Sequence, residues 1–349
     1  MNLIAFTRQL IDIPSVSGDE AVVARALAAH LEALGFRVKL QTVAGERANV
    51  IATTAARPRV VLSTHLDTVP PHIAASEDDE YIYGRGACDA KGIIAAQVAA
   101  AERLRAEGVE EIGLVFTVDE EQGSTGARAA NEHPLARECE YLINGEPTDN
   151  LLAAGSKGSL RVRLKTTGRA AHSAYPEQGE SAIEKLLAVL AEIRAHDWPR
   201  DEFFGETTCN IGTIDGGAGA NIIPAAAEAV LQLRLVTDAA RIKRELERIA
   251  DGRAQIEWLS VSAPVRLHAV TGFEQCVVRF TTDIPYLSNW GAPLLIGPGS
   301  ILDAHTAHER VSKRELERAV KLYVRLVRAL LARTKAYKIS GERAEGADA

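Results

Sequence analysis

Side chains able to bind a metal follow three apolar segments of the sequence, each where a buried strand is expected to end. His65 and Asp67 follow VVLST, Glu120 and Glu121 follow IGLVFTV, and Glu146 follows YLIN. Ligands of open α/β sheets bind beyond the carboxyl ends of parallel strands, so these side chains are expected to gather at one edge of a sheet. Because zinc accepts imidazole nitrogen and carboxylate oxygen, the pattern indicates a metal site there.

Two further donors stand in other motifs. Asp89 lies in GRGACDAKG, where it could instead cap the following helix, and His305 lies in DAHTAHE. Taken singly, each donor can be explained without a metal, as a polar residue of a turn or at a solvated helix start. Together they favour a metal centre. Two divalent ions ~3.5–4 Å apart can polarise a carbonyl and generate hydroxide from a bridging water. The set that suits such a pair, with room for water, is His65, Asp89, Glu121, Glu146 and His305.

The acidic residues outside this set have separate expected tasks. Asp67 stands two positions after His65 on the same side of an extended segment, where it can accept the other imidazole N–H. Glu120 lies next to Glu121 but points elsewhere, so it is free to take the proton of the water. Asp119 has no firm role beyond supporting the turn or the ligands.

Short apolar runs separated by a helical segment must position these residues. The runs are nearly continuous, as expected of strands buried on both faces of a largely parallel sheet, and they occupy 49–53, 59–64, 112–118 and 140–144. Ser17 and Glu20 form a capping box that predicts a helix ending near Gly35. The chain returns to an apolar strand at 293–297 and a final helix, so the sequence predicts an α/β fold with helices flanking the sheet.

The pattern changes after about residue 154. LRVRLKTTG alternates apolar with polar residues, and helical and strand patterns follow in the order β-α-β-β-α-β, which predicts a small open sheet with two helices on one face. We therefore expect a catalytic metal-binding domain formed by residues 1–153 and 264–349, interrupted by an inserted α+β domain at 154–263.

Composition excludes several classes of function. The 349 residues are 46% hydrophobic and 25% charged, which is typical of a soluble globular protein. The net charge of -7 is spread along the chain without a basic block, so we expect no nucleic-acid partner. No stretch approaches a membrane span, and the start lacks a signal-peptide pattern. The four cysteines show no C-x-x-C spacing, which suits a reducing compartment. Together these three features predict a cytoplasmic protein.

Five ordered motifs resemble those of the dinuclear-zinc aminoacylase and carboxypeptidase superfamily, which includes acetylornithine deacetylase and succinyl-diaminopimelate desuccinylase. They are STHLDTVP, YGRGACDAKG, TVDEEQGSTGA, NGEPT and GPGSILDAHTAHE, and the likeness covers nearly the whole chain. The resemblance implies two zinc ions, with cobalt as the alternative, and makes Glu120 the general base and Asp67 the residue that orients the histidine. It assigns as ligands, with the aspartate bridging, His65, Asp89, Glu121, Glu146 and His305.

The insert resembles the lid and dimerisation domain of the same family, which implies a homodimer. His172 in GRAAHSAYP matches a histidine, often from the neighbouring subunit, that holds the substrate carbonyl oxygen. Asn221 matches a substrate contact, and Arg234 matches an arginine that meets the substrate carboxylate, although an outward position on a strand is an equal alternative. Lys157 stands where relatives often carry Arg, so a carboxylate contact there would lack the bidentate fork.

Two departures from the family pattern affect the assignment. His308 fills a position that is usually acidic in the motif H-x-x-D-E, so it competes with His305 as a ligand, but the motif register and the retained Glu309 favour His305. The segment FTTDIPYLSNWG is shorter than in many relatives. The residues of the pocket that binds the substrate side chain are therefore not predicted.

The expected activity is metal-dependent removal of an N-acyl group, foremost acetyl, from an amino acid such as N-acetylornithine, because GPGSILDAH is nearer to the acetylornithine deacetylase branch. The alternative is a di- or tripeptidase or a carboxypeptidase on the same centre, so the substrate is a small N-acyl amino acid or a short peptide. A catalytically silent ligand-binding relative is a third interpretation, against which stands the presence of the base and all the ligands.

Overall fold

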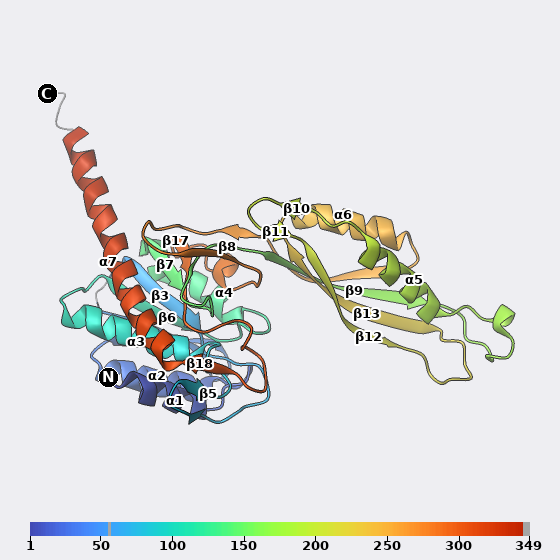
Figure 1. The fold of residues 1–349 in the computed structure, drawn as a ribbon, viewed down its shortest axis with the longest axis horizontal. Coiled ribbons are helices and arrows are strands. Elements are labelled where there is room, and N and C mark those ends of the chain that lie inside the picture. The colour runs from blue at the N-terminus through green and yellow to red at the C-terminus, as the bar shows by residue number, and fades with distance from the viewer. Residues whose placement is uncertain (55–56, 345–349) are drawn as a thin grey trace. The chain divides into compact units, whose positions relative to one another are not determined.

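A six-stranded mixed sheet lies at the centre of the first of two structural units in the computed structural model, which describes residues 1–54 and 57–344 (Figure 1). This unit comprises Met1–Ala154, Leu267–Cys276 and the chain from Thr282 onward, and the second unit comprises Gly155–Arg266 and Val277–Thr281. In spatial order the sheet contains β1 (Arg37–Ala44), β2 (Arg47–Thr53), β6 (Ile112–Thr117), β3 (Val60–His65), β7 (Tyr141–Asn144) and β17 (Ala292–Leu295).

Four neighbouring strands of this sheet, β6, β3, β7 and β17, run parallel, as predicted. The predicted strand at 49–53 differs, because β2 runs antiparallel to β6 and to β1. The pairing of β2 with β1 is antiparallel because the tight connection at Gly45 and Glu46 joins them, and a short turn joins only antiparallel strands. The fold class predicted from the sequence, α/β with a largely parallel sheet flanked by helices, is confirmed.

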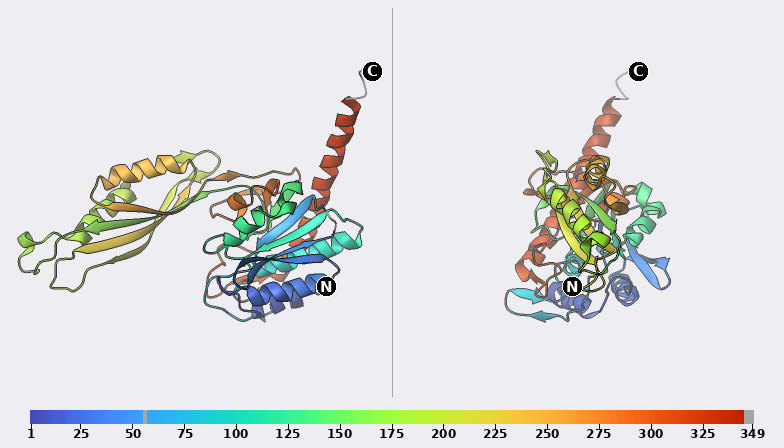
Figure 2. Two further views of the ribbon diagram at one scale, coloured as in Figure 1. Left: turned by 180° about the vertical axis from the view of Figure 1, so that it is seen from behind. Right: turned by 90° about the vertical axis from the view of Figure 1, so that its right-hand side faces the viewer.

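Helices cover both faces of the sheet. On one face α1 (Leu3–Asp12), α2 (Ala21–Ala33), α3 (Lys91–Ala106) and α7 (Lys313–Ala344) enclose the larger core with alternate strand residues such as Leu62 and Leu114. On the other face α4 (Thr125–Asn131) and the 3₁₀ helices at Pro134–Glu138 and Ile284–Tyr286 enclose a smaller core with Val61 and Val115. Because both faces are covered, the central strands β3 and β6 are buried along their whole length (Figure 1, and from behind in Figure 2).

The predicted capping box does not form. Helix α2 begins at Ala21, its N-cap residue is Glu20, and no side chain caps it. The Ser17 hydroxyl instead donates to Asp67 Oδ2 at 2.7 Å, and Glu20 accepts two hydrogen bonds from Arg47, at 2.6 and 2.7 Å. Hydrogen bonds to charged groups are stronger than those to neutral ones, so these partners replace the local cap.

The second unit is a four-stranded antiparallel sheet with two helices on one face (Figure 1). Its spatial order is β12 (Thr208–Gly216), β13 (Ala226–Leu235), β9 (Gly158–Thr167) and β14 (Gln255–Ser262). The helices are α5 (Ala182–Ala195) and α6 (Ala239–Ala250), so the chain order is the predicted β-α-β-β-α-β with a small hairpin, β10 (Arg200–Asp201) and β11 (Gly205–Glu206), added before β12.

Short strands complete the described structure. A three-stranded sheet contains β18 (Arg310–Ser312), β5 (Tyr81–Tyr83) and β4 (Ser76–Glu77), and another contains β15 (Val265–Arg266), β8 (Leu152–Ser156) and β16 (Gln275–Val278). A 3₁₀ turn lies at Pro176–Gln178. Among residues 1–54 and 57–344, every helix is too short or too polar to span a lipid bilayer.

Candidate metal centre

The carboxyl ends of three adjacent parallel strands, β6, β3 and β7, meet at one edge of the six-stranded sheet. His65 is the last residue of β3, and it pairs with Thr117 at the end of β6. Glu120 and Glu121 follow β6 within a few residues, and Glu146 follows β7, which pairs with β3 on its other side. The sheet topology therefore gathers the residues that the sequence places after separate strands.

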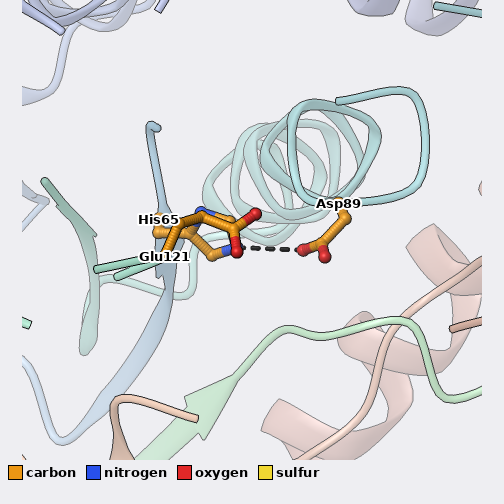
Figure 3. A group of neighbouring side chains, drawn as sticks. All are labelled: His65, Asp89 and Glu121. Carbon is orange, nitrogen blue, oxygen red and sulfur yellow. Dashed lines mark hydrogen bonds and ion pairs between the residues drawn. The ribbon is translucent and has the colours of Figure 1, made fainter. Parts of the chain in front are cut away.

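The five predicted ligands lie together at this edge. His65 Nε2 is 3.0 Å from Asp89 Oδ1 and 4.0 Å from Glu146 Oε2. His305 Nε2 is 2.9 Å from Glu121 Oε1 and 3.2 Å from Asp89 Oδ2. One donor atom from each of His65, Asp89 and Glu121 falls within a group whose members are all within 4.8 Å of one another (Figure 3). The two oxygens of Asp89 thus face different histidines.

The electrostatics of the cluster fit bound cations. Burial raises the pKa of Glu146 well above its usual value, and it also raises the pKa of Glu121. Hydrogen bonds to Asp89 and Glu121 raise the pKa of His305 to about 10. Carboxyls crowded in a buried site resist ionisation, and the positive charges that favour ionisation of Glu121 and Glu146 are those of the His65 and His305 imidazoles. Divalent ions would add positive charge and displace the protons, so this donor set suits them.

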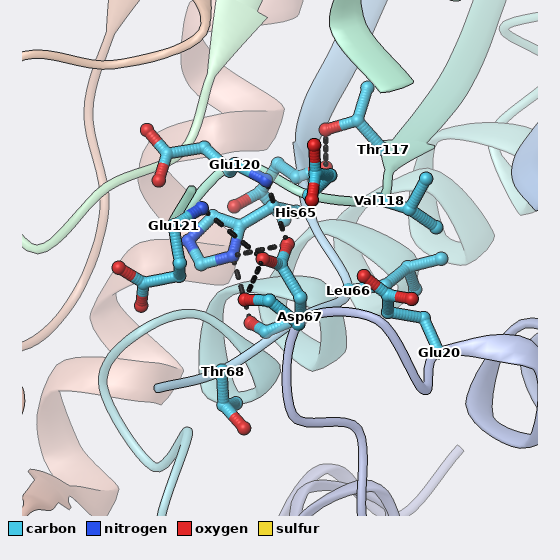
Figure 4. A network of polar contacts seen from close by, with 12 residues as sticks. Glu20, His65, Leu66, Asp67, Thr68, Thr117, Val118, Glu120 and Glu121 are labelled. Carbon is cyan, nitrogen blue, oxygen red and sulfur yellow. Dashed lines mark hydrogen bonds and ion pairs between the residues drawn. The ribbon is translucent and has the colours of Figure 1, made fainter. Parts of the chain in front are cut away.

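Asp67 organises the site mainly through backbone amides (Figure 4). Its Oδ1 accepts from the N–H of Glu120 at 3.0 Å, and its Oδ2 accepts from the N–H of Glu121 at 3.2 Å and from the Ser17 hydroxyl at 2.7 Å. The His65 Nδ1 lies 2.9 Å from the backbone carbonyl of Asp67 and 3.5 Å from its Oδ1. The imidazole is therefore oriented by the predicted residue, but its shorter contact is to the carbonyl oxygen.

Glu120 lies beside the ligands without joining their short contacts. Burial, reinforced by the charge of Glu146, raises the pKa of Glu120 well above its usual value. The Glu120 N–H donates to Asp67, which fixes the backbone from which this carboxyl projects, on the turn after β6. A carboxyl with a raised pKa next to a metal centre has the properties of a group that accepts and returns a proton.

Asp119 forms the turn that presents the two glutamates. Its backbone is left-handed, with φ of 70°, and its carbonyl accepts two amide hydrogen bonds within the turn. The side-chain Oδ2 accepts from the hydroxyl of Thr125 at 2.8 Å, and Oδ1 accepts from Arg47 at 3.0 Å. Asp119 therefore fixes the backbone from which Glu120 and Glu121 project.

The geometry separates the two candidate histidines of the last motif. His305 takes a left-handed backbone conformation, with φ of 64°, and its imidazole lies between Asp89 and Glu121. His308 is exposed, and within the described part of the chain its imidazole makes no hydrogen bond or ion pair. The structure thus places His305, and not His308, at the donor cluster.

One buried carboxyl near the site escaped the sequence analysis. Asp283 is 2% exposed, and its Oδ2 accepts from the Thr117 hydroxyl at 2.8 Å. Burial raises its pKa to about 6, and its charge also raises the pKa of Glu120 and of Glu146. It lies in the segment that departs from the family pattern, where the available signal was an acidic residue among apolar neighbours.

The remaining predicted residues belong to the inserted unit and form two groups. His172 and Asn221 are exposed and lie on neighbouring loops, because the N–H of Ser173 donates to the Asn221 carbonyl at 3.0 Å. His172 follows β9, and Lys157 directly precedes it. Since β9 has 10 residues, its ends are roughly 30 Å apart, so His172 and Lys157 lie at opposite ends of this sheet.

The group around Lys157 is basic and partly buried. Lys157 Nζ donates to the Glu206 carbonyl, and burial together with the nearby charge of Arg279 lowers its pKa. Arg234 on β13 pairs with Ser159 on β9, and Ser159 lies two residues after Lys157. Arg234 also donates to the Thr281 hydroxyl at 3.3 Å. Arg234 and Lys157 thus lie at the same end of the sheet.

Comparison with known proteins agrees with this fold. A model of peptidase family M20/M25/M40 matches residues 61–329. A probable carboxypeptidase of Aspergillus clavatus is 38% identical over 378 residues, covering 96% of this chain and 84% of that protein. A tripeptidase of Staphylococcus aureus has a TM-score of 0.77 at 22% identity, covering 92% of this chain and 96% of that chain.

A second solved structure has the same fold. An M20 family metallo-carboxypeptidase of Sulfolobus solfataricus has a TM-score of 0.77 at 17% identity, covering 94% of this chain and 99% of that chain. At these identities the solved structures show the fold, whereas the family model and the Aspergillus relative carry the assignment. The chain therefore belongs to peptidase family M20/M25/M40, a family of metal-dependent hydrolases of amide bonds.

Proposed function

We propose that this protein hydrolyses an amide bond whose nitrogen belongs to an amino acid with a free carboxylate, and so releases that amino acid. The observation that carries the proposal is the Glu120 carboxyl beside a cluster of five metal donors. A carboxypeptidase and an N-acyl-amino-acid deacylase both cut this bond. The name of the Aspergillus relative supports a short peptide, and the motif resemblance supports an N-acyl amino acid such as N-acetylornithine.

Two divalent ions are proposed, zinc with cobalt as the alternative, held by His65, Asp89, Glu121, Glu146 and His305. When bound, such ions polarise the scissile carbonyl and lower the pKa of the attacking water. Asp89 is suited to contact both because its two oxygens face different histidines. His65 and Glu146 would then hold one ion together with Asp89, and His305 and Glu121 would hold the other.

Glu120 moves the proton in this proposal. Its carboxylate accepts a proton from the attacking water, and the resulting carboxyl donates it to the leaving nitrogen. The raised pKa of Glu120 suits the intermediate task of holding the proton between these steps. Asp67 supports the transfer by fixing the Glu120 N–H and the His65 ring.

The inserted unit is proposed to read the substrate and to pair two chains. Lys157 and Arg234, with Arg279 nearby, offer positive charge for the substrate carboxylate. His172 is proposed to stabilise the oxyanion from a second copy of the chain, with Asn221 as a substrate contact, and this rests on the family resemblance. The exposed edge strand β12 supports pairing of this unit with another copy. A cytoplasmic location is also proposed, supported by four free cysteines.

A substrate panel tests the proposed bond. Dipeptides with a free carboxyl end are compared with the same dipeptides amidated at that end, together with N-acetylornithine, N-acetylcitrulline and N-succinyl-diaminopimelate, and Glu120→Ala is the control. We expect turnover only where the released amino acid carries a free carboxylate. Cleavage of the amidated dipeptides at equal rates would refute the proposal, and turnover of dipeptides alone would eliminate the deacetylase. Absence of all turnover would favour the silent relative.

A further inference from the structure

Glu309 is a buried carboxylate that binds the loop carrying Asp89. It is 1% exposed, and its Oε1 accepts from the backbone N–H groups of Gly86 at 2.9 Å, Asp89 at 3.2 Å and Cys88 at 3.3 Å. Its Oε2 accepts from Arg85 at 2.6 Å. One side chain thus fixes the backbone of the residue whose carboxylate lies at the centre of the donor cluster.

Arg85 extends this contact to the segment that carries His305. Its guanidinium donates to the Thr306 carbonyl at 3.1 Å and to the Pro71 carbonyl at 3.2 Å. Thr306 follows His305, whose left-handed backbone, with φ of 64°, is unfavourable for a residue other than glycine. The bond from Arg85 therefore fixes the peptide next to a strained ligand position.

Arg85 and Glu309 connect two ligands that lie far apart in the sequence. Asp89 Oδ2 and His305 Nε2 are 3.2 Å apart, although these residues come from opposite parts of the chain. The ion pair itself is buried, with side chains 3% and 0% exposed. A buried pair holds its geometry firmly, because separating the two charges leaves an uncompensated charge in the interior.

We propose that the Arg85–Glu309 pair sets the spacing between Asp89 and His305. That spacing determines whether the chain holds the divalent ion proposed for His305 and Glu121, which is called the second ion below. The inference rests on the proposed metal-dependent function. Both residues act through the ligands and so are positioning residues. Groups behind the ligands of a metal site typically change its affinity 10- to 100-fold when they are replaced.

The matched control is an ion pair at the opposite edge of the same sheet. Arg59 contacts Glu140 at 2.8 Å, and these residues precede β3 and β7 at their amino ends. Glu140→Gln makes the same chemical change as Glu309→Gln, at a partly exposed pair away from the metal donors. It shows what loss of an ion pair does when no ligand depends on it.

The experiment is a zinc titration of metal-free full-length protein, with the bound metal per chain measured after dialysis. We expect wild-type and Glu140→Gln protein to bind two ions. Glu309→Gln and Arg85→Lys are expected to bind one ion normally and the second at least about tenfold more weakly, and His305→Ala is expected to show the same loss. Arg85→Lys keeps a cation beside Glu309 but cannot reach the Thr306 and Pro71 carbonyls together, so it decides the question if Glu309→Gln does not fold.

The unfolding temperature of each metal-free variant separates stability from metal binding. If both positioning variants unfold at a lower temperature yet bind two ions with wild-type affinity, the inference is overturned and the proposed function stands. If wild-type protein binds no zinc or cobalt, the metal-dependent function fails first. A selective loss of the second ion in both variants, with two ions retained by Glu140→Gln, supports the inference.

Discussion

Asp119, Glu120 and Glu121 follow the same buried strand, yet the backbone gives each a different set of neighbours. Asp119 bonds to Thr125 and Arg47 within the turn, and Glu121 contacts His305. Among the residues that the structure describes, the Glu120 carboxyl has neither kind of contact, and burial raises its pKa. Identical chemistry at adjacent positions thus has three uses, because neighbouring residues on a turn point in different directions.

Single substitutions of the two glutamates should separate metal binding from proton transfer. Glu120→Ala should lower kcat by at least about 100-fold while the protein keeps its zinc, because general acid–base catalysis contributes 10²–10⁴-fold. Glu121→Ala should lower the zinc affinity, because the contact with His305 and the ligand oxygen are both lost. Steady-state kinetics and metal content of both proteins check this. Loss of zinc from Glu120→Ala would show that Glu120 is itself a ligand.

The pH dependence of the metal-free protein should report on His305. Hydrogen bonds to Asp89 and Glu121 raise its pKa from 6.5 to about 10, so the folded state binds the imidazolium proton more tightly than the unfolded state. The resulting stabilisation is fully present below pH 6.5 and is lost as the pH rises through about 10. Urea unfolding of wild-type and His305→Ala protein should therefore differ most at about pH 6 and least above pH 10. A difference that grows with pH would contradict this assignment.

At the scale of elements, the turn between β6 and α4 positions Glu120, the residue proposed to transfer the proton. Asn49 on β2 bridges its two ends, because its Oδ1 accepts from the Val118 N–H at 3.1 Å and its amide donates to the Gly126 carbonyl at 2.8 Å. A Cβ atom at Gly126 would lie 2.3 Å from the Val118 carbonyl oxygen and 2.6 Å from Asn49 Oδ1. Only glycine allows the two ends of the turn to approach this closely.

Gly126→Ala should therefore destabilise the protein and disturb the turn. We expect a loss of roughly 1–3 kcal/mol in the free energy of unfolding, as is typical of overpacking, together with a lower kcat. The control is Gly212→Ala on β12, where the nearest atom to an added Cβ is 3.4 Å away. Denaturant unfolding of both variants is the measurement. Equal stability of the two would show that the turn can widen without loss.

Two kinds of element could be predicted from the sequence, namely strands buried on both sides and the alternating strands and helices of the inserted unit. β3 and β6 are continuous apolar runs, so their burial and position could be inferred locally. β1 went unpredicted because all of its residues are partly or fully exposed, which breaks the apolar run, and without it the direction of β2 could not be inferred. Ser17 matched a capping pattern, but a distant carboxylate at Asp67 determines its actual partner.

At the scale of the whole molecule, the gathering of the metal donors was predictable because parallel strands align their carboxyl ends. His65, Glu121 and Glu146 were placed by that rule alone. Asp283 and Glu309 could not be placed, since their contacts to Thr117 and to the Asp89 loop join segments more than 150 residues apart. Contacts of this kind depend on the packed tertiary structure, which no local pattern records.

Mixed dimers should test whether His172 acts from a second chain. His172→Ala and Glu120→Ala are expected to be inactive separately. Coexpressed as mixed dimers, they should recover roughly one quarter of wild-type activity, because half of the dimers are mixed and each mixed dimer has one complete site. Differently tagged subunits allow the mixed dimer to be purified and assayed. A fully active monomer, or mixed dimers without activity, would contradict shared sites.

The order of the donors along the chain also has a consequence during synthesis. Four of the five precede the inserted unit, and His305 follows it, about 160 residues after Glu146. A ribosome that adds roughly 5–20 residues per second needs on the order of ten seconds to cover that distance. During this interval the nascent chain lacks β17 and the imidazole of His305. A hydrolase of amide bonds therefore stays without its full set of metal donors until the segment after the inserted unit has been translated.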